Sequence, residues 1–206
     1  MSNGDSQKIT YKIIIIGDSA VGKTCIFKKI VSGVFTEKSI STIGMDRRTL
    51  SFKIKNSEGN DLDVDVQLWD TAGEERFRSI TASYYNSSQG LLLMYDITNR
   101  DSFESVGNWI ENITDSLGQN EKYLIVLIGN KLDLADQRAV TTEEAQNLCK
   151  EKNIFWGGEC SAKDFTEEQL KEIFTGYTQE IYKIVGVKSS KAQFVGKKDK
   201  PKKSFC

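Results

Sequence analysis

Histidine is absent from this chain of 206 residues, and proline occurs once. Without histidine, zinc sites and serine-histidine-aspartate catalysis lose their usual residue. No apolar run approaches the roughly 18 residues that span a bilayer, so we expect membrane contact only through a group added to the chain. The four cysteines, Cys25, Cys149, Cys160 and Cys206, show no paired spacing, and no secretory leader precedes the first apolar run. We therefore expect a reducing compartment.

Charge is distributed unevenly along a chain whose composition, 38% hydrophobic and 28% charged, is that of an ordinary globular domain. Residues 183–206 carry eight lysines and one aspartate, hence +7, and the net charge of −1 leaves −8 for the remainder. An acidic body argues against nucleic acid as a partner, whereas a flexible basic tail suits an anionic membrane surface. A merely solvated tail is the alternative. We expect one domain at 8–183 and a flexible tail at 184–206.

Short apolar runs alternate with helical patterns, which predicts an α/β fold with a largely parallel sheet. Strands are expected at 11–16, 51–55, 63–69, 91–95 and 123–128, and helices at 25–31, 102–117, 142–152 and 165–185. The runs at 91–95 and 123–128 are continuously apolar, as strands buried on both faces are. The polar turn at 56–61 contains Gly59 and predicts a hairpin, and therefore one antiparallel edge.

A phosphate-binding motif lies between the first expected strand and the first helix. It reads GDSAVGKT and comprises Gly17, Asp18, Ser19, Ala20, Val21, Gly22, Lys23 and Thr24. The glycines let backbone amides face a phosphate chain, Lys23 can reach the outer phosphates, and the Thr24 hydroxyl can bind Mg²⁺. The motif alone does not distinguish GTP from ATP, or a hydrolase from a kinase.

Three shorter polar motifs follow other strands: DTAG at 70–73, NKLD at 130–133 and SAK at 161–163. Asp70 can hold Mg²⁺ through water, and the Gly73 amide can face a γ-phosphate. Each motif alone is weak, because a polar turn or a helix N-cap explains it equally well. Four such motifs after four strands favour a nucleotide site, because open α/β sheets bind ligands at the carboxyl ends of their strands.

Together these residues resemble the Ras superfamily. The resemblance implies the P-loop GTPase fold (G domain), a six-stranded, mostly parallel sheet with helices on both faces, here as a small GTPase domain at 8–183. It also implies that Asp133 pairs with guanine N1 and N2, that Asn130 braces the loops, and that the stem of Lys131 lies along the base. The Ala162 amide would donate to guanine O6, and Phe35 would meet the base edge.

The resemblance implies further positions in the same site. GTP or GDP would also contact Cys25, Thr42, Thr71, Ala72, Gly73, Ser161 and Lys163. Mg²⁺ would be held by Thr24, by Thr42 and, through water, by Asp70. Catalysis would depend on Lys23, Thr42, Gly73 and Glu74. The Thr42 amide would also contact the γ-phosphate, so loss of that phosphate should relax the loops around 34–47 and 70–84.

Several stretches look like Rab signatures: IGMD at 43–46, LWDTAGEERFRSIT at 68–81, YYNSSQG at 84–90 and LMYDIT at 93–98. The resemblance covers residue 11 to about 183 and implies a GTP-hydrolysing switch that regulates vesicle traffic. Its partners would be an exchange factor, a GTPase-activating protein, a GDP-dissociation inhibitor and effectors, acting through residues about 34–47 and 70–84. We expect a monomer.

Two positions depart from the Rab pattern. Arg47 stands where a phenylalanine usually packs with the aromatic residues that match Trp69 and Tyr84. An arginine could lie over those rings and offer a charged rather than an apolar patch, which would change the choice of effector. Glu74 stands in place of the glutamine that orients the attacking water. A slowly hydrolysing or GTP-locked binding module is therefore the alternative to a GTPase, and a P-loop kinase is a more distant one.

The tail ends in a single cysteine, Cys206, which resembles a Rab prenylation site, although the commoner ends carry two cysteines. One prenyl chain anchors weakly, and the tail lysines would supply the second signal that stable attachment needs. An unmodified cysteine is the alternative. We expect a cytoplasmic protein, peripheral on the cytosolic face of an intracellular or plasma membrane.

Overall fold

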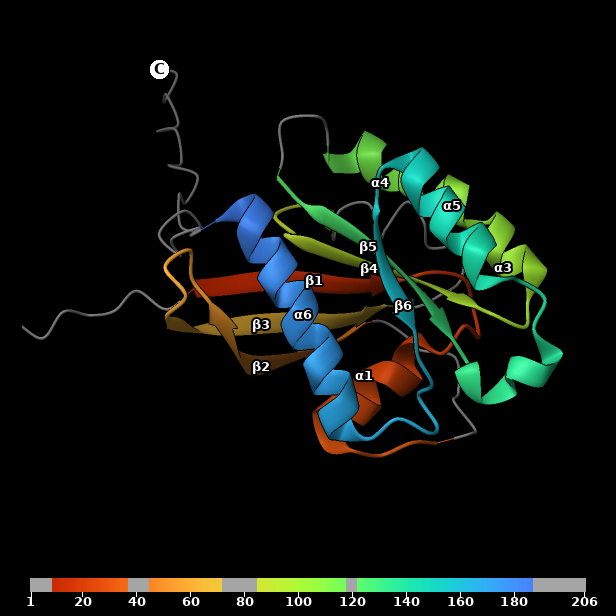
Figure 1. The fold of residues 1–206 in the computed structure, drawn as a ribbon, viewed down its shortest axis with the longest axis horizontal. Coiled ribbons are helices and arrows are strands. Elements are labelled where there is room, and N and C mark those ends of the chain that lie inside the picture. The colour runs from red at the N-terminus through yellow and green to blue at the C-terminus, as the bar shows by residue number, and fades with distance from the viewer. Residues whose placement is uncertain (1–8, 37–44, 72–84, 118–121, 187–206) are drawn as a thin grey trace, which may run out of the picture.

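The computed structural model of the chain describes residues 9–36, 45–71, 85–117 and 122–186. Six strands form one sheet in the order β2-β3-β1-β4-β5-β6 (Figure 1). Their bounds are β1 Ile9–Ile16, β2 Met45–Lys55, β3 Asp61–Thr71, β4 Gly90–Asp96, β5 Leu124–Asn130 and β6 Phe155–Glu159. β2 pairs antiparallel with β3, and every other pair is parallel. The expected sheet with one antiparallel edge is confirmed.

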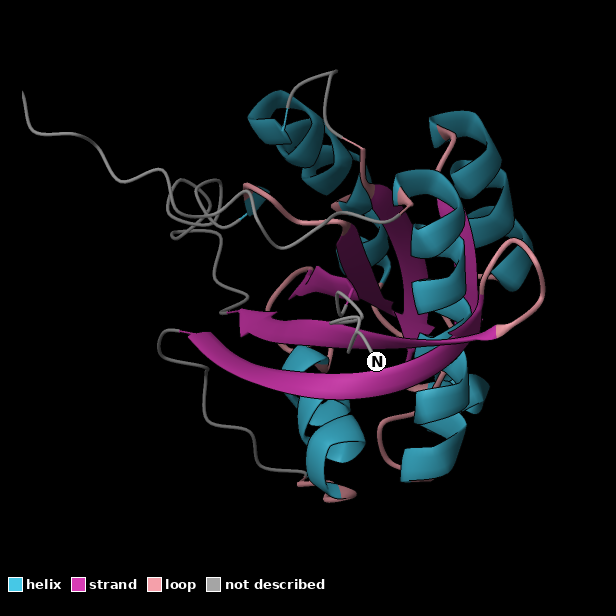
Figure 2. Ribbon diagram, turned by 90° about the vertical axis from the view of Figure 1, so that its left-hand side faces the viewer, coloured by secondary structure: helices cyan, strands magenta, loops and turns pink. Residues whose placement is uncertain are grey.

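Helices cover both faces of this sheet, as expected (Figure 2). Their bounds are α1 Lys23–Ser32, α3 Arg100–Glu104, α4 Val106–Leu117, α5 Thr142–Lys152 and α6 Glu167–Val185, with a 3₁₀ helix at Leu132–Gln137. α1 and α6 share one hydrophobic core with Ile13 and Ile15 of β1, whereas α3, α4 and α5 share the other with Ile14 and Ile16. This split follows from the strand period of two residues.

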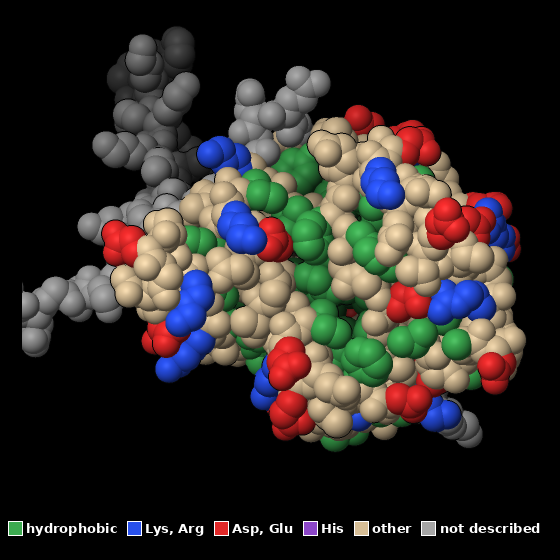
Figure 3. Space-filling view, in the orientation of Figure 1, with side chains coloured by type: hydrophobic (Ala, Val, Ile, Leu, Met, Phe, Trp, Pro, Cys, Tyr) green, Lys and Arg blue, Asp and Glu red, His purple; other side chains and the backbone are tan. Residues whose placement is uncertain are grey.

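β4 and β5 are buried along their whole length, which confirms the expectation from their continuous apolar runs. β6 is an outer strand, and Phe155 at its start is 38% exposed. Figure 3 shows the face of the molecule that is turned to the viewer in Figure 1. Hydrophobic side chains gather over the middle of this face, and acidic and basic side chains surround them. In the described part of the chain, no helix has the length and apolarity needed to cross a membrane.

Most element boundaries lie one or two residues from the sequence expectation, and three differences have an identifiable cause. β2 begins at Met45 rather than at residue 51. The sequence did not indicate this first part of the strand, because positions 46–49 are exposed at the sheet edge and show no apolar alternation. The helix expected at 102–117 is divided at Ser105 into α3 and α4. α6 begins at Glu167, where Thr166 and Gln169 form a capping box. The tail and the boundary at 183/184 stay predictions, since 187–206 lie outside the described residues.

Candidate functional site

The loop from Gly17 to Gly22 joins β1 to α1 and lies very close to neighbouring elements. A Cβ at Gly17 would lie 2.2 Å from the Met94 carbonyl oxygen of β4, and a Cβ at Gly22 would lie 2.2 Å from Asn130 Nδ2. Both glycines have positive φ, 136° and 98°. The phosphate-binding motif therefore needs its glycines here for close approach as well as for the turn.

Lys23 is folded back onto this loop and is only 5% exposed. Its Nζ donates to the Gly17 carbonyl at 2.8 Å and to the Asp18 carbonyl at 2.6 Å. Burial lowers the pKa of Lys23 to about 8, an effect that the Asp70 and Asp18 carboxylates oppose. An anion placed beside this ammonium would favour its charged form, so the position suits a phosphate.

Asp70, near the end of β3, lies beside Thr24, and the Thr24 hydroxyl donates to Asp70 Oδ2 at 2.7 Å. Among the described residues, Asp70 Oδ1 is buried without a hydrogen-bond partner. Burial raises the pKa of Asp70, which the Thr24 hydrogen bond and the Lys23 charge only partly oppose. The Asp70 carboxylate, buried beside the Thr24 hydroxyl, fits hydrated Mg²⁺, because the cation would stabilise the carboxylate charge.

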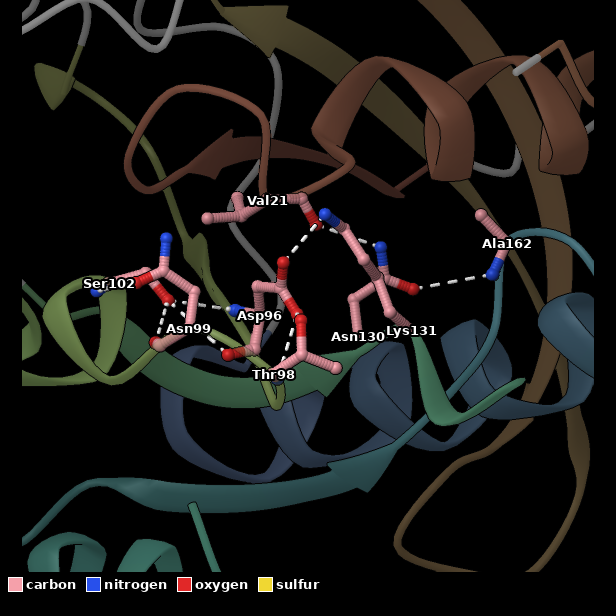
Figure 4. Close-up of polar contacts among 8 residues, drawn as sticks. All are labelled: Val21, Asp96, Thr98, Asn99, Ser102, Asn130, Lys131 and Ala162. Atoms are coloured by element: carbon pink, nitrogen blue, oxygen red, sulfur yellow. Dashed lines mark hydrogen bonds and ion pairs between the residues drawn. The ribbon is translucent and has the colours of Figure 1, made fainter. Parts of the chain in front are cut away.

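Asn130, at the end of β5, joins two loops that are distant in sequence (Figure 4). It is 1% exposed. Its Nδ2 donates to the Val21 carbonyl at 2.8 Å, and its Oδ1 accepts from the Ala162 amide at 3.2 Å. The phosphate loop and the loop after β6 are therefore connected through one buried side chain.

The residues expected at the base gather beside this connection. Ser161 Oγ donates to Asp133 Oδ1 at 2.6 Å and accepts the amides of Lys163 at 3.2 Å and Asp164 at 2.9 Å. Lys131 has a left-handed backbone, with φ 70° and ψ 39°. The structure thus brings the NKLD and SAK motifs together at one edge of the sheet.

Other expected site residues lie elsewhere or are not described. Cys25 is half-buried on α1, with its Sγ 3.8 Å from the Thr36 carbonyl oxygen, and Phe35 packs against the core shared by α1 and α6. Thr71 is buried and donates to the Ile15 carbonyl at 2.8 Å. Ser19 is exposed and Ala20 has a left-handed backbone, with φ 63°. Thr42, Ala72, Gly73, Glu74 and Cys206 lie outside the described residues.

Two side chains that contact the site were not predicted to belong to it. Asp96 ends β4 and pairs with Lys131, Oδ2 to Nζ, at 2.6 Å. Trp109 of α4 donates from Nε1 to Asp18 Oδ1 at 2.8 Å. The sequence could have indicated Asp96 as a site residue, because it is a polar residue at the end of an apolar strand, like the first residues of the recognised motifs. Trp109 did not, because a tryptophan on the apolar stripe of a helix is typical of a core residue.

The expected contact between Arg47 and Trp69 is confirmed. The Arg47 guanidinium carbon lies 5.2 Å from the Trp69 ring centroid, and Lys12 Nζ lies 5.0 Å from it. Trp69 lies on β3, which pairs with β2 on one side and with β1 on the other. Arg47 approaches the ring from β2, and Lys12 approaches it from β1. The surface at Trp69 is therefore flanked by positive charge; Tyr84 lies outside the described residues.

This fold and site define the class of protein, a P-loop nucleotide-binding domain. The family model described as "Ras family" matches residues 12–183. The chain is 41% identical over 194 residues to Ras-related protein RABA4d of Arabidopsis thaliana, covering 92% of this chain and 83% of the relative. It is 38% identical over 192 residues to GTP-binding protein ypt3 of Schizosaccharomyces pombe, covering 93% and 85%. A third relative is Ras-related protein Rab-19 of Xenopus laevis, 41% identical over 177 residues, covering 86% and 79%.

The chain therefore belongs to the Ras family and is a Rab-type small GTPase of the Ras superfamily. It binds guanine nucleotide and hydrolyses GTP, as members of this family do. The more distant alternative, a P-loop kinase, is thereby set aside.

Proposed function

We propose that this GTPase is a nucleotide-dependent switch in vesicle traffic and that its nucleotide lies along the carboxyl ends of β1, β3, β5 and β6. The observation that carries the proposal is the position of Asn130, which contacts both the phosphate loop and the loop of Ala162. A ligand with phosphates at one end and a base at the other spans both loops. A nucleotide has that form.

In this proposal the phosphate half of the site uses Lys23, Thr24 and Asp70. Bound Mg²⁺ would neutralise charge on the outer phosphates. Thr24 and Asp70 would hold the cation, Asp70 through water, and the Lys23 ammonium would turn from its two carbonyl partners toward the phosphate oxygens. Thr42 and the Gly73 amide would sense the γ-phosphate, so its loss would change the surface that partners contact.

The base half decides which nucleotide binds. Asp133 would accept hydrogen bonds from guanine N1 and N2, donors that adenine does not present in this arrangement. Asp133→Asn should replace an acceptor with a donor and shift preference from guanosine toward xanthosine nucleotides. Competition with GTP, XTP and ATP against a fluorescent GDP measures the shift. Asp136→Asn, the same charge change at an exposed position of the same 3₁₀ helix, is the matched control. Equal affinity of the unmodified protein for ATP and GTP would contradict the proposal.

Glu74 is proposed to set the hydrolysis rate. A carboxylate can accept a hydrogen bond from the attacking water, but it cannot donate one to the γ-phosphate as an amide does. We expect Glu74→Gln to hydrolyse bound GTP faster in single turnover and to respond better to a Rab-activating protein. Glu75→Gln, the same change one residue later, is the control. Equal rates for the parent and Glu74→Gln would show that Glu74 does not time the switch.

Attachment to a membrane is proposed to depend on Cys206 and the basic tail. A prenyl group on Cys206 and the lysines of 184–206 would together supply two signals, one apolar and one electrostatic. Regulators and effectors would bind through residues about 34–47 and 70–84. Because Arg47 makes this surface charged, we expect its partners to differ from those that bind an apolar patch. Cell fractionation tests the anchor, because Cys206→Ser should leave the membrane fraction. Unchanged membrane binding would exclude lipidation at this position.

A further inference from the structure

Asp96 lies at the end of β4, directly across from Asn130 in the parallel pairing of β4 with β5. Its side chain is only 7% exposed. Asp96 Oδ2 contacts Lys131 Nζ at 2.6 Å, while Asp96 Oδ1 accepts the Thr98 amide at 2.9 Å and the Thr98 hydroxyl at 2.7 Å (Figure 4). One carboxylate oxygen therefore holds the turn after β4, and the other holds a lysine from the neighbouring loop.

The ion pair restricts a side chain that would otherwise be free to rotate. Lys131 is 31% exposed, and its long stem has four rotatable bonds. Its left-handed backbone, φ 70°, is a conformation that non-glycine residues keep only where their surroundings hold it. With the ammonium fixed at Asp96, the aliphatic stem must run from the end of β5 toward the end of β4. The ion pair therefore holds the stem in this direction.

We propose that Asp96 is a positioning residue for the purine ring, acting through Lys131. The inference rests on the proposed nucleotide site, in which the Lys131 stem lies along the base. A stem already held in place loses little conformational entropy when a ring packs on it, so the ion pair raises nucleotide affinity. Because the stem contacts a ring face and no hydrogen-bonding edge, Asp96 affects all purine nucleotides alike. Discrimination between purines falls to the groups that face the base edge, Asp133 and the Ala162 amide.

Asp96 also stabilises the turn after β4, and the experiment must distinguish this structural role from the positioning of Lys131. The Asp96 amide donates to Ser102 Oγ at 3.1 Å, and Asn99 Oδ1 accepts the Ser102 amide at 3.3 Å, so the turn and the start of α3 depend on this segment. Asp96→Asn keeps an oxygen for Thr98 but removes the charge that attracts Lys131. Thr98→Val does the reverse, because it removes one hydrogen bond of the turn and leaves the ion pair intact.

The test measures the binding of fluorescently labelled GDP and IDP to the full chain. The variants are Asp96→Asn, Lys131→Met, their combination and Thr98→Val; methionine keeps an unbranched stem without the charge. We expect Asp96→Asn and Lys131→Met each to weaken GDP and IDP binding by the same factor, about five- to tenfold, corresponding to one ordered long side chain. The double variant should bind no more weakly than Lys131→Met, and Thr98→Val should bind like the parent.

Each of the following outcomes would overturn the inference: an additional loss from Asp96→Asn in the Lys131→Met background, an equal loss in Thr98→Val, or a changed ratio of GDP to IDP affinity. If Asp96→Asn does not fold, Lys131→Met still decides, because parent-like binding by that variant also overturns it. Failure of the proposed function is a different result. In that case the unmodified protein itself would not bind labelled GDP.

Discussion

Replacing Gly22 with alanine would test whether the phosphate loop and the base loop are mechanically coupled. The new methyl group would lie 2.2 Å from Asn130 Nδ2 and 3.5 Å from Asn130 Cγ. Asn130 is 1% exposed and packed between two loops, so it has no open space into which to move. The substitution must either displace Asn130 from its contacts with Val21 and Ala162 or push the phosphate loop away from β5.

The expected magnitude follows from two separate costs. Alanine at φ 98° occupies a left-handed conformation, which costs about 1 kcal/mol relative to glycine. Displacement of Asn130 loses its bonds to the Val21 carbonyl and the Ala162 amide, at about 1 kcal/mol each. We therefore expect the free energy of unfolding to fall by about 3 kcal/mol. If nucleotide binding must restore the two bonds, GDP affinity should fall about thirtyfold.

Gly59→Ala is the matched control, because it carries the backbone cost without the collision. Gly59 lies in the turn between β2 and β3 at φ 82°, and a Cβ there would meet no heavy atom within 4 Å. Urea unfolding should show a loss of about 1 kcal/mol for this variant, and GDP titration should show parent affinity. Equal stability losses in the two variants, with GDP affinity unchanged in both, would refute the coupling through Asn130.

Two further predictions concern contacts at the edges of the site. Burial raises the pKa of Glu159, but the paired hydrogen bonds from Arg138, both 2.7 Å, and a further one from a hydroxyl outweigh it, so this pKa lies below its usual value. Relative to Glu159→Gln, we expect Glu159 to raise the free energy of unfolding by about 2 kcal/mol. This difference should be complete above the unfolded pKa of glutamate, about 4.3, and should be lost as pH falls through the lowered pKa of the folded state. Urea unfolding at several pH values measures it, and a difference that does not change with pH would count against the prediction. Trp109→Phe removes the donor to Asp18 while keeping a ring, and GDP affinity should fall about tenfold. Trp156→Phe on β6 should leave it unchanged, and equal affinities in the two tryptophan variants would show that the Asp18 contact does not support binding.

Local patterns predicted most of the sheet. The continuous apolar runs of β4 and β5 and the polar turn around Gly59 were enough to place buried strands and an antiparallel hairpin. The first half of β2 was missed for a physical reason. Its residues face solvent at the sheet edge, so no alternation of apolar and polar residues exists there to detect.

The sequence by itself determined the phosphate loop, because GDSAVGKT is contiguous and its spacing places the turn, the lysine and the threonine hydroxyl within one local segment. It also determined the family, through motifs that can be compared in order along the chain. Neither argument required knowledge of which strands are neighbours.

Only the tertiary structure decided how the motifs meet. Asn130 contacts Val21, 109 residues earlier, and Ala162, 32 residues later, and the Asp96 pair with Lys131 crosses between two strand ends. These contacts depend on the order β1-β4-β5-β6, which places the carboxyl ends of separate strands at one edge. Strand order is set by packing of the whole core, and no local residue pattern encodes it; a buried carboxylate such as Asp96 therefore reveals its partner only once the sheet is assembled.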